Sequence, residues 1–584
     1  MEIDVAVGYL PERQQLMISM TLKPLAFGED KIRQVLPWLV SWWGETLPHE
    51  HHALWHTDLG IIGLMHNLVC QDARLPLFDP PVVDAAGNRL TLWVPTFLGL
   101  NKEVHRRAVG SVISSIQQTS EQRCHGILSR AVTEVHELAG DQVLGSSDGT
   151  IPILAEVHRL GLSIYPQVSD LVKVGQGAYS RLLHASASDA DSAAGLLISE
   201  SKSRTSVVLQ RAGIPSPTTL STQDPSDAEQ LIKSMRLPLV VKPERGARGE
   251  GVHTFVESVA ALKKAIDAAI RTSPVNIALV QQQLSGDCHR VQVINGKAMW
   301  ASTRFPKSVV ADGKSTVEQL VGSANQKLKE MAARRRLRPF PLDQLADATL
   351  RRQGLSKKSV PPAGVRINLR PVTSVADGGD VRSITETLHP ANAALCVEAA
   401  LACGLSTAGI DFFSVDPTAP WFENGGTILE VNYKPQIFNR VSDRANKEIS
   451  RAFIQELVSG ADRVPVYAVI GDHGAAEVAA KHHKELVAKG VNAWLCKSGV
   501  IAGPDNIERP LEDALLAPTL LGLMQNPKVE AIVVQVGQWG ANLALPLPHV
   551  SNIDVSALPP SSGWKNDTWS RVVQRLEKSL KTVE

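Results

Sequence analysis

The sequence predicts a multi-domain α/β protein, and three observations support this fold class. At 584 residues the chain is longer than one hydrophobic core usually organises. Hydrophobic residues make up 43% and charged residues 20%, which is typical of a folded globular protein. Strand-like runs also alternate with helix-like periodic segments along the chain, as RLTLWVPTF and VHRRAVGSVISSIQQ illustrate.

Charge and cysteine content narrow the class of protein. Sixty Lys and Arg against 59 Asp and Glu leave a net charge of +1, so no whole-chain field favours nucleic acid or a membrane surface as partner. The six cysteines lack C-x-x-C spacing, which argues against a zinc site and a disulfide framework. The start MEIDVAVGYLPERQQ has no basic segment followed by an apolar run, and no stretch of about eighteen apolar residues occurs. We therefore expect a cytoplasmic protein.

Composition divides the chain into three predicted domains. Residues 1–165 read as a small α/β domain with strands at IDVAVGYL, LMISMTL and RLTLWVPTF. A second domain is expected over residues 166–462 and a third over 463–584. The run ASASDADSAAGLLISES, residues 185–201, is rich in small polar residues and reads as a loop or boundary.

The second domain carries a phosphate-binding pattern in VVKPERGARGEG, residues 240–251. Lys242 ends a β-rich run, and the loop after it contains Gly246, Gly249 and Gly251. A fixed cation beside a row of accessible backbone N–H groups is suited to cradling phosphate. The glycine spacing alone is a weak signal, because a dinucleotide fingerprint also needs a parallel βαβ unit.

Metal-ligating residues follow much later in the same domain. Asp411 in DFFSV, with Glu430 and Asn432 in TILEVN, places hard oxygen ligands on strand-like segments. Such a set suits a Mg²⁺ ion that bridges nucleotide phosphates. Between the two motifs, HRVQVINGKAMWASTRF alternates around Asn295-Gly296, which predicts an antiparallel hairpin. A glycine loop, an antiparallel sheet and magnesium ligands together indicate an ATP-grasp ligase.

The middle segment resembles the ATP-grasp half of cyanophycin synthetases, which build an aspartate backbone bearing arginine side groups without a ribosome. The resemblance is carried by SKSRTSVVLQRAGIPSP, VVKPERGARGEGV, SGDCHRVQVINGKAM, RFPKSVVADGKSTVEQL, KKSVPPAG, AGIDFFSVD and GGTILEVN. It implies ATP and Mg²⁺ as cofactors and roles for the following residues: phosphate binding by Lys202 and Lys242, a lid of Gly246, Gly249 and Gly251, stabilisation of an acyl phosphate by Arg290 and Arg370, and magnesium binding by Asp411, Glu430 and Asn432.

Two positions depart from that family's pattern. The adenine hinge reads Val280-Gln281-Gln282-Gln283 instead of V-E-R-Y, so Gln281 would bind the nucleotide without a charged acceptor. After the metal ligands, NYKPQ replaces N-A-A-P-G and introduces Tyr433 and Lys434. Both departures bear on the substrate.

The third domain resembles a Mur-ligase-like domain that has lost its catalytic residues. GDHGAAE, residues 471–477, stands where the family has G-T-N-G-K-T-T, so Ala475 replaces the phosphate lysine and Ala476 the metal-binding hydroxyl. VQVGQWG stands for L-E-T-A-R-G-G, which puts Gln535 in place of a carboxylate and Gln538 in place of an arginine. We expect a degenerate, truncated Mur-ligase-like domain without ATP hydrolysis.

The combination resembles the second, dipeptide-polymerising type of cyanophycin synthetase. It implies a homodimer that extends a cyanophycin-like polymer with β-aspartyl-arginine dipeptides. Two alternatives stay open: an ATP-grasp ligase that joins other amino acids or a small amine, and a non-catalytic binding or regulatory subunit. The intact charged residues argue against the second alternative.

Two further patterns have plainer readings. His49, His51, His52 and His56 lie in HEHHALWH, which lacks H-x-x-E-H and reads as a polar loop. In the following IIGLMH only His66 remains of a metallopeptidase-like set. The basic run RRRLRP, residues 334–339, reads as a solvated helix end, with contact to a polymer as the alternative.

Overall fold

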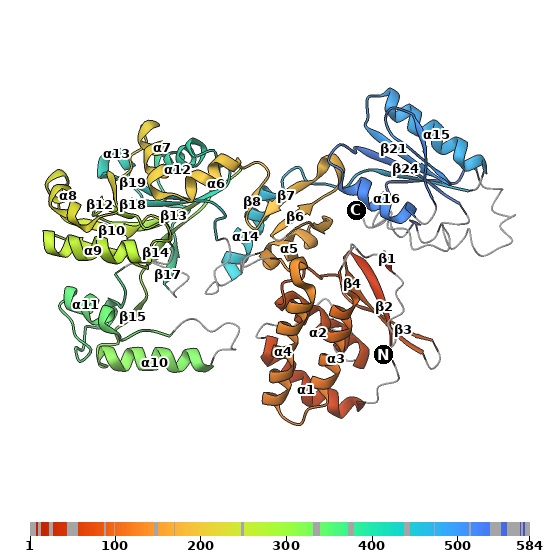
Figure 1. The fold of residues 1–584 in the computed structure, drawn as a ribbon. Coiled ribbons are helices and arrows are strands. Elements are labelled where there is room, and N and C mark those ends of the chain that lie inside the picture. Colours follow the sequence, from red (N-terminus) through yellow and green to blue (C-terminus); the bar gives the residue numbers. More distant parts are fainter. Residues whose placement is uncertain are drawn as a thin grey trace. The chain divides into compact units, whose positions relative to one another are not determined.

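The structure is a computed structural model of the chain, and it divides into two compact units that are described separately here (Figure 1). Unit 1 combines Met1–Ala185 with Val458–Glu584, and unit 2 is Ser186–Leu457. The structure describes residues 7–9, 13, 15–22, 27–43, 57–86, 89–97, 100–144, 150–168, 170–246, 250–330, 339–371, 379–436, 444–471, 473–512, 515–537, 550–557, 573 and 576–577.

The divisions differ from the predicted limits at residues 165 and 462. Backbone hydrogen bonds explain the shift, since Gln176 N donates to Asp462 O and Asp462 N donates to Tyr179 O. Ala178 N donates to Val529 O in the same way. The segment after residue 165 is therefore built into the C-terminal part of unit 1.

Unit 2 is organised around a five-stranded antiparallel sheet in the order β17-β14-β13-β18-β19. Its strands are β13 (Asp287–Ile294), β14 (Lys297–Phe305), β17 (Asp380–Ser383), β18 (Ala408–Ser414) and β19 (Thr427–Asn432). The predicted hairpin is confirmed: Asn295 and Gly296 have φ of 45° and 74°, and Ile294 pairs with Lys297. Positive φ at both central residues matches the twist of the flanking strands.

Helices cover one face of this sheet and leave the other for polar residues. Helices α7 (Lys202–Arg211) and α12 (Pro390–Ala402) share a buried core with Val291, Ile410 and Phe412. Because successive side chains of a strand point to opposite faces, Asp411 faces away from that core.

A second sheet of unit 2 has the order β11-β10-β12-β9 and carries the glycine-rich loop. Its strands are β9 (Thr219–Thr222), β10 (Leu239–Pro243), β11 (His253–Val256) and β12 (Ala278–Gln282). Helices α8 (Ala228–Ser234) and α9 (Val259–Thr272) pack on it, and α9 runs along the sheet in Figure 1. The loop from residue 244 to residue 252 joins β10 to β11.

The remaining elements of unit 2 include a small subdomain with its own core. It pairs β15 (Ser308–Val310) with β16 (Arg366–Asn368) under α10 (Val317–Glu330) and α11 (Gln344–Arg352). The other elements are β8 (Ala187–Ser188), α6 (Ala193–Ser199), α13 (Trp421–Asn424) and α14 (Arg444–Leu457). The run 185–201, predicted to be a loop or boundary, contains the division between the units, but it also forms α6, which Ser192 caps by accepting a hydrogen bond from Gly195 N.

The N-terminal part of unit 1 is a four-stranded sheet, ordered β1-β2-β4-β3, with helices packed against it. Its elements are β1 (Val7–Tyr9), β2 (Leu16–Leu22), β3 (Val82–Ala86), β4 (Arg89–Thr96), α1 (Gly28–Trp43), α2 (Asp58–Asp72), α3 (Lys102–Ile116), α4 (Glu121–Ala139) and α5 (Thr150–Arg159). The strands predicted at LMISMTL and RLTLWVPTF are β2 and β4.

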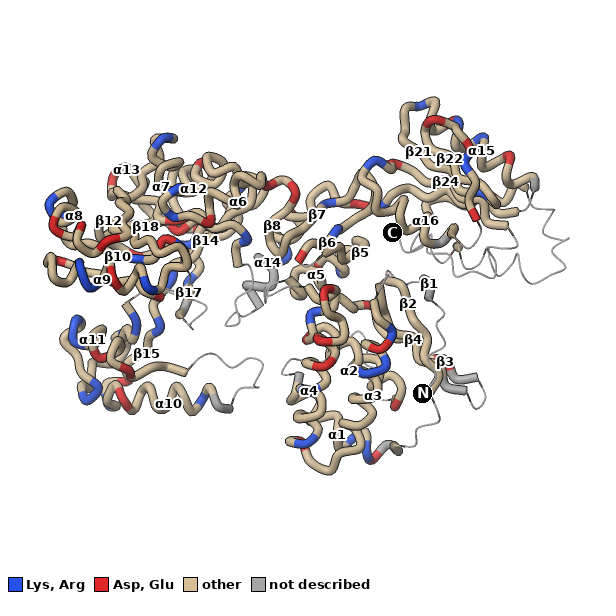
Figure 2. Tube along the Cα trace, in the orientation of Figure 1, with Lys and Arg blue, Asp and Glu red and all other residues tan. Residues whose placement is uncertain are grey.

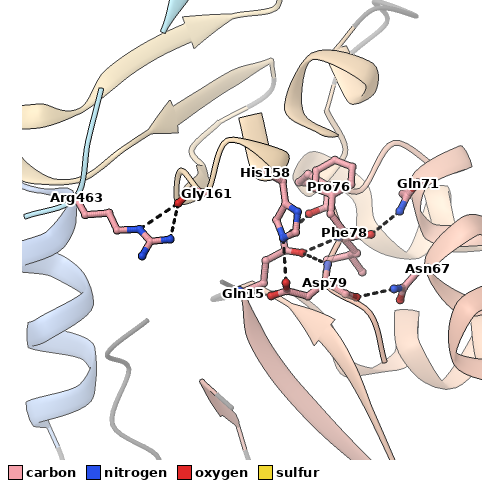
Figure 3. Close-up of polar contacts among 10 residues, drawn as sticks. Gln15, Asn67, Gln71, Pro76, Phe78, Asp79, His158, Gly161 and Arg463 are labelled. Atoms are coloured by element: carbon pink, nitrogen blue, oxygen red, sulfur yellow. Dashed lines mark hydrogen bonds and ion pairs between the residues drawn. The ribbon is translucent and has the colours of Figure 1, made fainter. Parts of the chain in front are cut away.

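A buried polar network fastens these elements together (Figure 3). The Gln15 side chain accepts from Phe78 N and Asp79 N and donates to Pro76 O at 2.6 Å. The Asp79 carboxylate lies 3.0 Å from His158 Nε2 on α5. Each polar group taken from water here gains a partner, which is the condition for burying it.

The C-terminal part of unit 1 is a six-stranded sheet in the order β23-β22-β21-β24-β20-β25. Its elements are β20 (Val466–Ile470), β21 (Ala493–Lys497), β22 (Val500–Ala502), β23 (Glu508–Pro510), β24 (Ala531–Val536), β25 (Asn552–Asp554), α15 (His473–Ala488) and α16 (Leu516–Gln525). Strands β21, β24, β20 and β25 are parallel. The short antiparallel strands β5 (Ile164–Pro166), β6 (Leu171–Val174) and β7 (Arg181–His184) precede unit 2.

Candidate active site

Two lysines and a carboxylate meet at the start of the glycine-rich loop in unit 2. Lys202, the first residue of α7, places Nζ 3.1 Å from Gly246 O and 3.5 Å from a Glu430 carboxylate oxygen. Lys242 lies near the end of β10 and is 7% exposed. Lys202, Glu430 and the motif with Lys242 and Gly246 are far apart along the chain, and the fold brings them together.

Burial and neighbouring charges set the protonation of Lys242. Its pKa is lowered to about 8, mainly by desolvation and also by the nearby Lys202, while Glu430, Asp411 and Glu244 favour the charged form and limit the shift. These carboxylates are close enough to act on the ammonium group but do not offset its burial. Lys242 is therefore a cation that an incoming phosphate would stabilise.

The three predicted magnesium ligands share one end of the β18–β19 pair. Asp411 pairs directly with Glu430 across the two strands, so both carboxylates project from the same face. Asn432 pairs with Gly409, and its side-chain nitrogen donates to Gly409 O at 3.0 Å and lies 3.5 Å from an Asp411 oxygen. This contact leaves the Asn432 amide oxygen as the atom suited to a metal.

The donor set fits magnesium bound together with phosphates. Two carboxylates and one amide oxygen are hard ligands, and Mg²⁺ in nucleotide sites is commonly held by one or two carboxylates plus phosphate oxygens. Among the described residues no group of three or more His, Cys, Asp or Glu side chains could hold a metal ion alone. Phosphate oxygens and water would therefore have to complete the coordination shell.

Two arginines neutralise Asp411 from the neighbouring strands. Arg290 on β13 pairs with Asp411 in register, and its Nε lies 2.8 Å from the carboxylate. Arg304 on β14 lies 3.6 Å from the same group. Burial and the adjacent Arg290 lower the pKa of Arg304. Both signs of charge gather around β10, β14 and β18 in Figure 2.

Gly409 explains how the Arg290 guanidinium fits over the sheet. A Cβ atom added at Gly409 would lie 2.0 Å from Arg290 Nη1 and 3.1 Å from Pro435 Cβ. Real Cβ atoms do not approach so closely, so only glycine leaves room here. The run A-G-I-D that carries Asp411 thus also admits the arginine that contacts it.

Sequence reasoning missed Glu244 and Arg304. Glu244 is 5% exposed, and one of its carboxylate oxygens accepts hydrogen bonds from Ser201 and Ser203 at the start of α7. A carboxylate directly after K-P, with two serines ahead of a predicted helix, could have suggested this contact. Arg304 gave no such signal, because only the register of β14 brings it to Asp411.

The remaining nucleotide-binding predictions have mixed outcomes. Gly251 has φ of 69°, and a Cβ there would lie 2.4 Å from Thr272 Oγ1, so this loop position requires glycine. Gly249 lies outside the described residues. Gln281 is buried on β12, where its side-chain nitrogen donates to Thr219 Oγ1 at 2.6 Å, and it takes part in sheet packing.

Arg370 is not placed with the other predicted residues. Its two terminal nitrogens contact both carboxylate oxygens of Asp343, at 2.9 and 2.6 Å, where Asp343 caps α11. The Arg370 contact lowers the pKa of Asp343. Among the described residues, the recorded contacts of Arg370 stay within the subdomain and do not reach Arg290 or Asp411. The sequence could not reveal this bidentate pair.

Unit 1 holds a second strand–loop–helix at the position predicted to be a lost phosphate loop. Residues 471–472 join β20 to α15 at the carboxyl end of a parallel strand, where such sheets bind ligands. Ala475 is fully buried there. Gln535 on β24 is 3% exposed, and its side-chain nitrogen donates to Gly471 O at 3.1 Å. Its oxygen accepts from Ser498 N at 3.3 Å. Gln538 lies outside the described residues.

The N-terminal histidines have a structural setting. His66 is fully buried, with one ring nitrogen 2.9 Å from Asn67 Oδ1 and the other 3.0 Å from His105 Nδ1. Burial lowers the pKa of His66 to about 4 and that of His105 as well. The cluster from His49 to His56 lies outside the described residues, as does RRRLRP except for its proline.

The cysteines and the apolar character of the helices bear on the chemistry and setting of the protein. All six cysteines are buried as free thiols, and burial raises the pKa of Cys403 to about 11. Such thiols are poor nucleophiles. Across the described helices, none combines the length and apolar character needed to cross a membrane.

Comparisons with known proteins show what this chain is similar to. A family model described as a RimK-like ATP-grasp domain matches residues 199–308. Cyanophycin synthetase from Synechocystis sp. is 29% identical over 353 residues, which cover 59% of this chain and 40% of that protein. Cyanophycin synthetase from Geminocystis herdmanii is 27% identical over 421 residues, covering 71% and 48%. The chain thus spans less than half the length of these curated relatives.

A glutathione-forming protein and a solved structure are also similar. The glutathione biosynthesis bifunctional protein GshAB from Streptococcus agalactiae is 31% identical over 206 residues, which cover 34% of this chain and 27% of that protein. The crystal structure of a bifunctional glutathione synthetase from Pasteurella multocida overlaps 60% of this chain and 50% of that one, with 23% identity and a TM-score of 0.39. The chain is thus similar to cyanophycin synthetases over 59–71% of its length, and residues 199–308 match a RimK-like ATP-grasp domain.

Proposed function

We propose that this protein is an ATP-dependent, ADP-forming carboxylate–amine ligase that extends a cyanophycin-like polymer with β-aspartyl-arginine dipeptides. The polymer's C-terminal carboxylate would be phosphorylated by ATP to an acyl phosphate. The dipeptide amine then attacks the acyl carbon, a C–N bond forms, and phosphate leaves with the C–O electron pair while the amine loses a proton.

One observation supports this proposal: the lysines predicted to bind phosphate lie beside the carboxylates predicted to bind metal in unit 2. Lys202 contacts both Gly246 of the loop and Glu430 of the metal set. The negative charges of Glu430 and Asp411 act to raise the pKa of Lys242. A purely structural ion pair would need one cation and one carboxylate, whereas this cluster assembles several of each from separate elements.

The residues have distinct proposed roles in this chemistry. Lys202 and Lys242 bind the transferred phosphate, and the loop with Gly246, Gly249 and Gly251 covers it. Arg290 neutralises the negative charge that develops on the acyl phosphate and the tetrahedral intermediate. Asp411, Glu430 and Asn432 would hold magnesium, which would neutralise charge at the phosphate oxygens. Arg304 also contacts Asp411 and so adds a second positive charge next to Arg290.

Arg370 and Gln281 keep proposed roles that require a change of partner. Arg370 contacts Asp343 in this structure, so its proposed role at the acyl phosphate requires that pair to open. The side chain of Gln281 contacts Thr219, and its backbone pairs within the sheet with Val240 and Thr219, so its proposed contact with the nucleotide requires one of these partners to be released.

The C-terminal part of unit 1 supports a single working site. Ala475 offers no cation for phosphate, and Gln535 offers an amide where metal binding needs a carboxylate. The Gln535 amide instead bonds the loop after β20 to the loop after β21. An enzyme with one ligase site could not add arginine separately, so we propose that each added unit carries both amino acids.

The test compares ADP release with two substrate sets. Wild-type protein is incubated with ATP, Mg²⁺ and a cyanophycin primer, plus either β-aspartyl-arginine or free aspartate and arginine. We expect ADP release and product masses that rise by whole dipeptides only in the first case. Growth by single amino acids would contradict the proposal.

A second candidate is a ligase that joins a different amine to a carboxylate. Tyr433 and Lys434, which follow the metal ligands, favour this alternative because they alter the region next to the reacting groups. A primer that does not grow with dipeptide, together with ADP release on another amine, would establish it.

A further inference from the structure

The turn directly after the metal ligands presents one residue that the roles above leave unassigned. Lys434 follows Asn432 by two residues and is half-buried. Its Nζ lies 5.8 Å from the centre of the Tyr433 ring, and Tyr433 packs against the core of the large sheet. The Tyr433 ring, which the core holds in place, therefore favours one position of the Lys434 ammonium group.

The backbone of this turn is fixed on both sides. Asn432 pairs with Gly409, and Pro435 Cβ lies beside the same glycine together with the Arg290 guanidinium. Ser186 Oγ donates to Pro435 O at 2.6 Å, and Gln292 Nε2 donates to Gln436 O at 2.9 Å. Lys434 thus lies on a short turn, held in place on both sides, between a proposed metal ligand and a proline that, like the Arg290 guanidinium, lies next to Gly409.

Lys434 also adopts a backbone conformation that does not suit lysine. Its φ is 53°, in the left-handed region that favours glycine and asparagine. Unfavourable conformations of this kind cluster at functional sites and persist where the surrounding structure enforces them. A glycine would satisfy the backbone better, so the contribution of lysine at this position lies in its side chain.

The proposed amine substrate creates a need for such a cation. In β-aspartyl-arginine the aspartyl α-carboxylate is one carbon from the attacking nitrogen. When the nitrogen reaches the acyl phosphate, that carboxylate approaches a phosphate and the carboxylates of Asp411 and Glu430. Like charges at this range disfavour binding unless a cation lies close by. Arg290 and Arg304 already contact Asp411.

We propose that Lys434 is a specificity-determining residue that binds the α-carboxylate next to the attacking amine of the incoming substrate. This inference rests on the proposed function, because it assigns the amine side of the same reaction. It defines the substrate class as an α-amino acid whose carboxylate is free, with the side chain carrying the rest of the dipeptide.

Steady-state kinetics with Lys434→Gln tests the inference. We expect the KM for β-aspartyl-arginine to rise about tenfold or more, because a charged hydrogen bond is lost, while the KM for ATP stays within about twofold. Lys434→Arg should retain much of the affinity. Lys434→Gly should show the same KM defect with an unchanged or higher melting temperature, since it relieves the backbone. Lys264→Gln, on an exposed position of α9, removes one charge elsewhere and serves as the control.

A substrate analogue separates charge recognition from a structural effect. β-Aspartyl-arginine with its aspartyl α-carboxylate converted to the carboxamide should bind wild-type protein about tenfold more weakly. Lys434→Gln should not distinguish the two substrates. If the wild type ligates the dipeptide but Lys434→Gln keeps its KM and its preference, the inference is wrong and the proposed function stands. If the wild type ligates no such dipeptide, both are wrong.

Discussion

The charged site of unit 2 and the buried Gln535 amide of unit 1 differ in how their polar groups are satisfied. The site in unit 2 holds Lys202, Lys242, Arg290, Asp411 and Glu430, all charged and several of them buried. At the carboxyl ends of β20 and β24 in unit 1, the corresponding polar group is the neutral Gln535, whose amide is bonded at both its nitrogen and its oxygen. A cluster of buried charges gains stability when a charged ligand binds. A neutral amide whose donor and acceptor are both hydrogen-bonded stabilises the fold without a ligand.

The lowered pKa of Lys242 shows the cost of the first arrangement. A lysine whose pKa falls to about 8 is destabilised in its charged form by its surroundings. Nothing comparable arises at Gln535, which does not titrate. The comparison therefore predicts that substitutions in the first site remove activity and substitutions in the second remove stability.

The largest expected effect is at the unit 2 site. Lys242→Ala and Glu430→Ala should each lower ATP-dependent ligation by about a hundredfold or more, because a phosphate cation or a metal carboxylate stabilises the transition state. Folding should persist, which circular dichroism and melting temperature would check. Gln535→Ala is the matched control, with ligation retained. Wild-type turnover in either purified variant would contradict the assigned roles.

The next effect is on stability, at the unit 1 site. Gln535→Glu restores the carboxylate that the family carries, but it buries a charge and removes the donor to Gly471 O. We expect the free energy of unfolding to fall by about 2–4 kcal/mol, with ligation unchanged. Gln282→Glu, exposed on β12, should shift stability by less than about 0.5 kcal/mol. Equal melting temperatures for the two variants would show that the Gln535 bonds do not stabilise the loop.

The sequence singled out the charged residues that gather in unit 2 better than it indicated their contacts. Lys242, Asp411 and Glu430 stand out because phosphate and metal binding require particular residue types near strand ends, whereas Lys202 is indicated only by the family resemblance; the roles of all four stay predictions. The hairpin at Asn295-Gly296 was also predictable, since both positions need positive φ.

The missed features depend on tertiary register. Arg304 reaches Asp411 only because β14 lies beside β13 with Cys288 opposite Arg304. Arg370 contacts Asp343 through a pair separated by 27 residues, which no local pattern announces. The unit boundary at Ala185 lies in the run 185–201 that composition marked as a loop or boundary, whereas the hydrogen bonds that join residues 176–179 to Asp462 follow from no local pattern. Pairing between residues far apart in the sequence cannot be predicted from a short segment alone.

A smaller effect concerns protonation on nucleotide binding. At pH 8.5 a lysine with a pKa of about 8 is mostly neutral, and a bound phosphate raises its pKa. Binding of ATP at this pH should therefore take up about half a proton or more, and its affinity should fall as pH rises above 8. Calorimetry in buffers of different ionisation enthalpy measures the uptake. Lys242→Arg, which stays charged, should abolish it, and equal uptake in both proteins would rule out Lys242 as the source.

The smallest effect separates the glycines of the two loops. A Cβ at Gly474 would meet only Ala557 Cβ, at 3.9 Å, which is ordinary contact, and Gly474 lies in the first turn of α15. Gly474→Ala should therefore leave ligation unchanged and alter stability by no more than about 1 kcal/mol, in the stabilising direction, because alanine favours helix. Gly251→Ala is the contrast: φ of 69° and a Cβ 2.4 Å from Thr272 Oγ1 make it strained, and we expect weaker ATP binding. Measured ATP affinity and melting temperature decide the matter, since a working phosphate loop at residues 471–477 would need Gly474 as much as the unit 2 loop needs Gly251.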